Sequence, residues 1–189
     1  MSGGSVPRRS VLVGLWRVAR GKADGIACFG NDAPSFLSSL APLLAFPLVG
    51  AAAGLFTEGP GRALTDLAMT LCALLTPAVV SYELARVWQR TDAWVRFATA
   101  FNWCEWILPI LACLILVPLS VAITLGMTED VASLILLGSL GSYGLWLHWF
   151  LARNALSLSR FRAVAMVFLV NLATVAVVMG PRLLIHGFA

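Results

Sequence analysis

Residues 106–128, WILPILACLILVPLSVAITLGMT, decide the fold, because they run for 23 positions without a charged side chain. A helix needs about 20 apolar residues to cross the hydrocarbon core of a bilayer. Inside lipid, backbone N–H and C=O groups must bond within their own segment, so such a stretch folds as a helix. We therefore expect a transmembrane helix at residues 104–126.

Four further stretches of the same kind surround this one. They have charge-free lengths of 25, 16, 22 and 19 residues and predict transmembrane helices at 34–56, 65–86, 131–151 and 161–181. The second stretch is short, but the long side chain of Arg86 can reach the interface and extend it. The sequence thus predicts an all-α, polytopic membrane protein, with five transmembrane helices in a single membrane domain over residues 1–189.

The composition excludes the main soluble classes. The chain is 60% hydrophobic and 12% charged, whereas a soluble domain carries about 25% charged residues. The net charge is +4, yet nucleic-acid binding needs a concentrated basic face. Here the basic residues are spread through the gaps between apolar stretches, so the expected surroundings are a lipid bilayer and no nucleic acid.

The placement of these basic residues predicts the orientation. Eleven of the 13 lie before the first stretch, between the second and third, or between the fourth and fifth, which must share one side. Positive residues favour the cytoplasm, so we expect a cytoplasmic N-terminus and a periplasmic C-terminus in a bacterial inner (plasma) membrane. The tryptophans fall beside the same face: Trp16, Trp88, Trp94, Trp103, Trp106, Trp146 and Trp149.

Two segments have the pattern of helices that lie on a membrane surface. In Ser10–Phe29, apolar residues share one stripe and Arg17, Arg20 and Asp24 lie elsewhere, which predicts an N-terminal amphipathic interfacial helix over 10–29. Trp88–Phe101 has a similar aromatic face. The alternative for both segments is ordinary packing beside the membrane helices.

Placing a polar side chain in a membrane helix costs free energy, so each such residue suggests a structural or functional role. Four of them should lie at a similar depth near the cytoplasmic interface: Glu83, Asn102, Glu105 and His148. Glu83, Glu105 and His148 could converge into a carboxylate–imidazole cluster that binds a cation or moves a proton. The alternative is that each side chain reaches interfacial water or a neighbouring arginine.

Small residues predict where helices pack against each other, because they let two backbones approach closely. Gly50 and Gly54 form one such pair, and a stripe in the fourth helix consists of Gly138, Gly141, Ser142 and Gly144. Packing within the chain is the main expectation and a dimer interface is the alternative. Asn171, in the middle of the fifth helix, should bond to another helix, with Thr76 and Ser139 as its candidate partners.

The sequence carries no pattern that identifies a reaction. It has no nucleophile elbow, no Gly-rich phosphate loop and no zinc-binding helix motif. Its cysteines, Cys28, Cys72, Cys104 and Cys113, form no closely spaced pair. We expect no enzymatic activity, no cofactor and no metal site.

One segment resembles a known family. Residues 151–178, LARNALSLSRFRAVAMVFLVNLATVAVV, are similar to the basic, small-residue loop and last helix of the Yip1-domain family. Members of that family are small proteins with a cytosolic N-terminus and five membrane helices. The Asp-Leu-Tyr-Gly-Pro stretch and long polar N-terminal arm of eukaryotic members are absent, so their recognition of partner GTPases does not carry over.

The resemblance implies a fold rather than a mechanism. Together with it, the five-helix layout and the aromatic and basic cytoplasmic face lead us to expect a non-enzymatic organising or protein-interaction module, whose partner is a membrane protein or another copy of itself. Two alternatives stand beside it. One is a small transporter or ion- or proton-handling component, and the other is an accessory subunit of a larger membrane complex.

Overall fold

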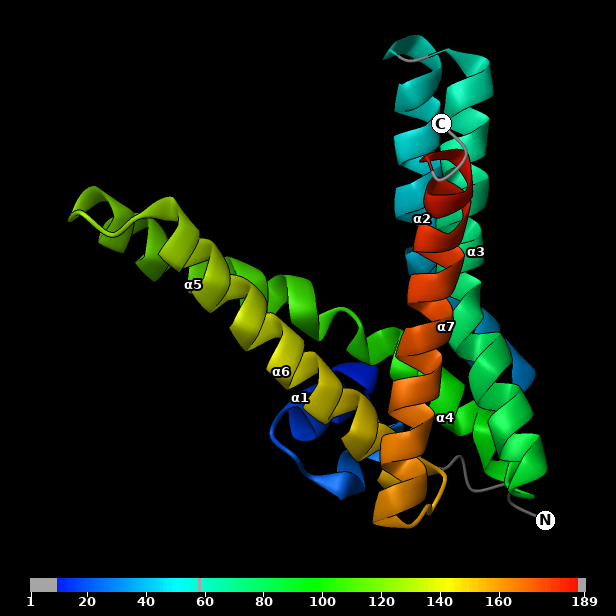
Figure 1. The fold of residues 1–189 in the computed structure, drawn as a ribbon. Coiled ribbons are helices and arrows are strands. Elements are labelled where there is room, and N and C mark those ends of the chain that lie inside the picture. The colour runs from blue at the N-terminus through cyan, green and yellow to red at the C-terminus, as the bar shows by residue number, and fades with distance from the viewer. Residues whose placement is uncertain (1–9, 58, 187–189) are drawn as a thin grey trace.

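The computed structural model of this protein describes residues 10–57 and 59–186, with side chains described up to residue 180 (Figure 1). Within this part of the chain every regular element is a helix. The elements are α1 (Val11–Ala19), η1 (Ala23–Cys28), α2 (Ala33–Thr57), α3 (Pro60–Val87), α4 (Thr91–Cys104), α5 (Ile107–Thr124), α6 (Glu129–Ala155) and α7 (Arg160–His186).

The predicted fold class is confirmed. Among the described residues, five helical segments are long and apolar enough to cross a membrane: Ala33–Thr57, Pro60–Val87, Thr91–Thr124, Glu129–Ala155 and Arg160–Gly180. The third segment combines α4 and α5, because Glu105 and Trp106 keep nearly helical backbone angles between them.

The second of these helices starts earlier than predicted, at Pro60 rather than at residue 65. Proline suits the first position of a helix, since its missing N–H would have no partner there. Gly59, just before it, has a φ of +86° that few other residues adopt, and this ends α2 and starts α3 in a tight turn.

The long helices form two groups that diverge from one end. The helices α2, α3 and α7 stand side by side, with α3 in contact with both neighbours, whereas the α5–α6 hairpin leans away from them (Figure 1). The α3–α4 and α6–α7 connections lie at the same end as α1. The α2–α3 connection lies at the opposite end of its hairpin (Figure 1).

The core lies almost entirely at the shared end, which we call the base. The base comprises α1, η1, α4, the C-terminal end of α6 and the N-terminal half of α7. Its fully buried side chains include Val18, Ala100, Leu147, Leu151, Leu156 and Met166. Farther out, large apolar side chains such as Leu114 and Val117 are exposed, as expected where lipid replaces a protein core.

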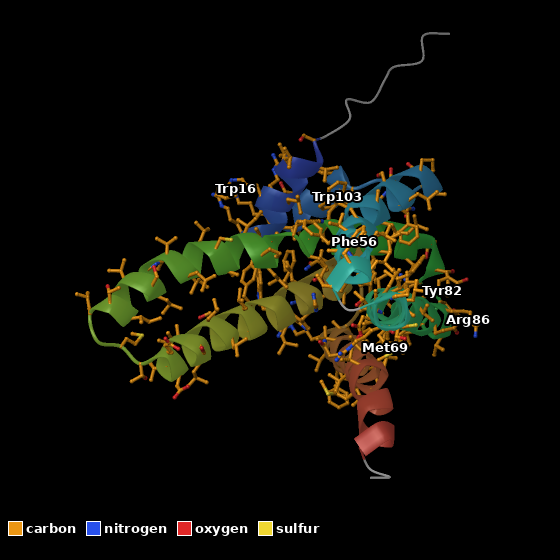
Figure 2. The ribbon with its side chains drawn as sticks, turned by 90° about the horizontal axis from the view of Figure 1, so that it is seen from above. Trp16, Phe56, Met69, Tyr82, Arg86 and Trp103 are labelled. Atoms are coloured by element: carbon orange, nitrogen blue, oxygen red, sulfur yellow. The ribbon has the colours of Figure 1, made fainter. Side chains whose placement is uncertain are left out.

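The prediction of one continuous helix over 10–29 is wrong. The helix α1 ends at Ala19, because Gly21 adopts a φ of +71° and the amides of Gly21 and Lys22 bond back to Val18 and Arg17. This is the glycine-dependent end that many helices use. The chain then folds back as η1. Only α1 keeps an exposed apolar face, with Leu12 and Trp16 on it; Figure 2 shows Trp16 pointing outward.

Residues 88–101, the second segment predicted to lie on the membrane surface, pack against other helices of the protein instead. The helix α4 is not laid on a surface but packs against α1, α2, α3 and α6. Phe97, Ala100 and Cys104 are buried in the base, and the indole N–H of Trp94 donates to Ser81 Oγ on α3 at 3.1 Å. The alternative of packing beside the membrane helices therefore holds for this segment.

Candidate functional site

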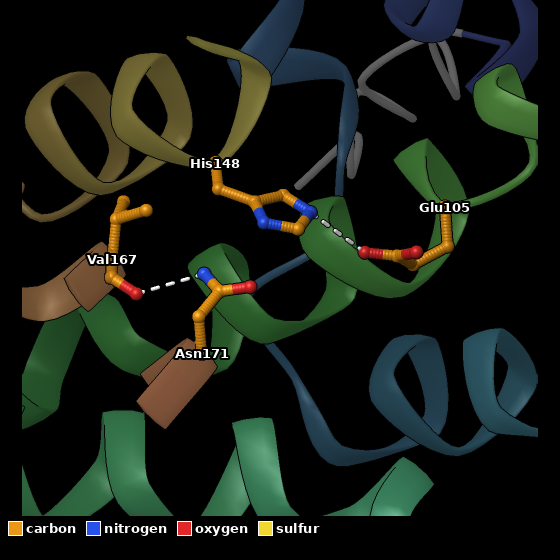
Figure 3. A network of polar contacts seen from close by, with 4 residues as sticks. All are labelled: Glu105, His148, Val167 and Asn171. Carbon is orange, nitrogen blue, oxygen red and sulfur yellow. Dashed lines mark hydrogen bonds and ion pairs between the residues drawn. The ribbon is translucent and has the colours of Figure 1, made fainter. Parts of the chain in front are cut away.

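A carboxylate and an imidazole meet at the junction of α4 and α5. Glu105 Oε1 lies 2.8 Å from Nε2 of His148 on α6 (Figure 3). Both side chains are largely enclosed, with exposed fractions of 30% and 18%. The imidazole also packs on the ring of Phe101, with 4.7 Å between ring centroids. The contact is a hydrogen bond when His148 is neutral and an ion pair when it is protonated.

The other two residues of the predicted polar cluster lie elsewhere. The carboxylate of Glu83 pairs with Arg86 at 2.7 Å, one turn along the same helix, and both are exposed. The amide of Asn102 donates to Ser39 Oγ at 3.0 Å and ties α4 to α2 inside the protein. Of the three residues predicted to converge, the structure therefore pairs Glu105 with His148, while Glu83 follows the alternative of a neighbouring arginine.

The predicted interhelical bond of Asn171 is wrong. Its amide donates to the carbonyl of Val167 on its own helix, at 2.8 Å (Figure 3). The hydroxyl of Thr76 likewise donates to its own helix, at Cys72. Short polar side chains can bond a carbonyl one turn back, so Asn171 meets its requirement without another helix.

Most of the glycines that we predicted to pack against another helix have no other helix in contact with them. Gly54 does pack, since a Cβ placed there would lie 3.3 Å from Cβ of Ala63 on α3. A Cβ at Gly50, Gly138 or Gly141 would meet nothing within 4 Å. Ser142 is exposed beside them. Gly144 of the same stripe does pack within the chain, since a Cβ placed there would lie 3.6 Å from the side chain of Leu108 on α5. The prediction is wrong for Gly138, Gly141 and Ser142, because the α5–α6 hairpin leans away from the other helices (Figure 1).

An apolar cleft of about 530 Å³ reaches Glu105 from the side of the diverging helices. We call it the α2–α5 cleft. It is lined by Leu43, Phe46 and Pro47 of α2, Thr70 and Leu74 of α3, and Glu105, Trp106, Leu108 and Pro109 at the start of α5. Glu105 is the ionisable residue among them. Sequence reasoning missed this cleft, because its three walls are far apart in the chain.

A smaller cavity of about 180 Å³ adjoins the α2–α5 cleft, with which it shares Pro47 and Thr70. Its lining includes the carboxylate residue Asp66, and the linings of both hollows contain no lysine or arginine. The polar groups offered to a ligand here are therefore anionic or neutral. Within residues 10–57 and 59–186, here as elsewhere, no three His, Cys, Asp or Glu side chains are grouped to hold a metal ion.

Comparison with known proteins identifies no relative. No protein-family model, curated protein or solved structure matches this chain.

Proposed function

We propose that this protein is a non-enzymatic membrane interaction module, whose α5–α6 hairpin binds a transmembrane helix of another protein. The observation that carries the proposal is the isolation of this hairpin. It leaves the packed base and extends away from α2, α3 and α7 (Figure 1). Exposed apolar side chains cover both of its helices, among them Leu114 and Val117 on α5 and Leu134 and Leu137 on α6.

The small residues of α6 explain why a helix, in particular, would bind there. Lipid tails are as apolar as leucine, so helices associate in a bilayer through close packing of backbones and through interhelical hydrogen bonds. Gly138 and Gly141 leave the α6 backbone open, and the exposed Ser142 adds a hydroxyl group beside them. The five membrane-length helices and residues 151–178 support a module of the Yip1-like kind.

The same arrangement supports a proposed orientation. The base carries Arg17, Arg20 and Lys22 near α1 and Arg153 and Arg160 near the α6–α7 connection. Cytoplasmic loops collect positive charge, so this proposal puts the base at the cytoplasmic face of a bacterial inner membrane.

Site-specific photo-crosslinking in native membranes tests the proposal. A photoreactive residue at position 142 should give adducts with a protein, while one at position 79 on α3, which is also exposed, should give adducts with lipid alone. Gly138→Leu should abolish the protein adduct, and Gly61→Leu, which also enters open space, should leave it intact. Adducts with lipid alone at position 142 would contradict the proposal.

Mass spectrometry of the crosslinked protein then identifies the partner. A second copy of this chain would indicate a homo-oligomer. A different membrane protein that is recovered in a stable assembly would indicate an accessory subunit of a larger complex.

A second candidate function, ion or proton handling, is favoured by the enclosed pair of Glu105 and His148. Proton flux into liposomes tests it: Glu105→Gln should abolish the flux, and Glu83→Gln should not. The apolar lining of the cleft that reaches Glu105 offers little support for a water-filled path, and for this reason we rank this function second. Equal flux with and without the protein would rule it out.

A further inference from the structure

The lining of the α2–α5 cleft contains two aromatic rings and one carboxylate. The rings of Phe46 on α2 and Trp106 on α5 lie 5.2 Å apart between centroids, tilted by 46°. Both residues line the cleft together with Glu105. An aromatic face attracts a cation within about 6 Å of the ring centre, and a carboxylate does so more strongly.

The carboxylate of Glu105 has capacity for a second partner. His148 occupies Oε1, and no other side chain among the described residues bonds Oε2. A carboxylate can accept about four hydrogen bonds. A cation could therefore approach Oε2 while His148 keeps the side chain in position.

The negative charge of the cleft lining favours a positively charged ligand. The cleft and the cavity that adjoins it offer two carboxylates, Glu105 and Asp66, without a lysine or arginine. An anion would be repelled by both carboxylates, and the unpaired indole N–H of Trp106 is a neutral donor that does not offset their charge. A phospholipid with an ammonium head would bring its phosphate close to the same carboxylates, with no basic side chain to receive it.

We propose that the α2–α5 cleft is a binding site for a compact hydrophobic cation. Its charged centre would lie between Glu105 Oε2 and the rings of Phe46 and Trp106, and its apolar body would contact Leu43, Leu74 and Leu108. The volume of about 530 Å³ falls within the range of small-molecule sites, about 300–1,000 Å³. This site is separate from the face of α6 that carries the proposed function, so either can fail alone.

Calorimetric titration of the purified protein in dodecyl maltoside tests the site, with tetraphenylphosphonium as the probe. Wild-type protein should bind it saturably. Tetraphenylborate, which has the same shape and the opposite charge, should show no saturable binding. Excess dihexanoyl phosphatidylethanolamine should not displace the probe. Saturable binding of tetraphenylborate, displacement by the lipid, or no saturable binding of the probe would overturn the proposal.

Three variants locate the site. Glu105→Gln keeps an acceptor for His148 but removes the charge, so affinity for the probe should fall about tenfold or more. Leu74→Trp fills the cleft and should abolish saturable binding. Glu83→Gln, whose carboxylate pairs with Arg86 outside the cleft, is the matched control and should bind as wild type. Unchanged affinity in Glu105→Gln would refute the role of its carboxylate.

A measurement on wild-type protein covers the case in which a variant fails to fold. Carbodiimide modifies accessible carboxylates, and mass spectrometry reports the rate at each position. Tetraphenylphosphonium should slow modification of Glu105 at least threefold and leave that of Glu83 unchanged, because protection follows occupancy of the site (about threefold when two thirds is occupied). Equal rates at Glu105 with and without the probe would overturn the proposal.

Discussion

At the scale of single residues, His148 and Glu105 depend on each other. Removing the imidazole leaves a carboxylate that is 30% exposed without its hydrogen-bond partner. We expect His148→Ala to lower the free energy of unfolding by about 1–2 kcal/mol. His148→Gln, which can still donate, should cost less. Thermal unfolding in dodecyl maltoside measures both.

Glu83→Gln is the control for this pair, because its ion pair with Arg86 is exposed. Such pairs contribute between 0 and about 1 kcal/mol. If His148→Ala were no more destabilising than Glu83→Gln, the enclosed pair would have no structural role.

Asn102 and Ser39 give a second prediction at this scale. Their hydrogen bond joins α4 to α2 inside the protein, so a double-mutant cycle of Asn102→Ala and Ser39→Ala should show a coupling energy of about 0.6–1.7 kcal/mol. Asn171 and Thr76 bond their own helices instead, so the same cycle there should show coupling near zero. Unfolding by denaturing detergent measures both cycles, and similar values would contradict this pairing.

At the scale of elements, α1 packs closely on η1 because Gly14 and Gly25 have no side chains. A Cβ at Gly25 would lie 2.7 Å from Cβ of Arg17 and 2.8 Å from the carbonyl oxygen of Gly14. We expect Gly25→Ala to cost about 1–3 kcal/mol through overpacking and to separate α1 from the base. Hydrogen exchange should then rise in residues 11–28.

The long helices should keep their protection in Gly25→Ala, because the atoms nearest to the added Cβ all belong to α1. Gly61→Ala is the matched control, since its added Cβ meets nothing within 4 Å. Unchanged exchange in residues 11–28 of Gly25→Ala would show that α1 does not depend on this contact.

At the scale of the whole molecule, the arrangement predicts which connections share a side of the membrane. Ser157 lies in the α6–α7 connection and Met127 in the α5–α6 connection. In a background without the four cysteines, Ser157→Cys should react with an impermeant maleimide from the cytoplasmic side and Met127→Cys from the other side. Labelling of both from one side would contradict five membrane crossings in this order.

The residues of the candidate site could be recognised from the sequence. Glu105 and His148 stand out in the sequence because charged or polar residues in apolar helices are rare and costly. The sequence allowed both a cluster of Glu83, Glu105 and His148 and separate contacts with arginine. That Glu105 meets His148 while Glu83 pairs with Arg86 on its own helix depends on how separate helices rotate and lean. The α2–α5 cleft was hidden for the same reason: Phe46, Leu74 and Trp106 come from three segments.

The sequence by itself determined the five membrane-length helices and the all-helical class, because apolar length is a local property that lipid converts directly into helix. Only the tertiary structure decided that residues 10–29 fold back at Gly21, that Asn171 bonds its own helix, and that the α5–α6 hairpin stands apart with Gly138 and Gly141 uncovered. These outcomes depend on contacts between segments that are far apart in the chain, and a single interhelical hydrogen bond contributes only about 0.6 kcal/mol on average, so they are decided only when the helices meet.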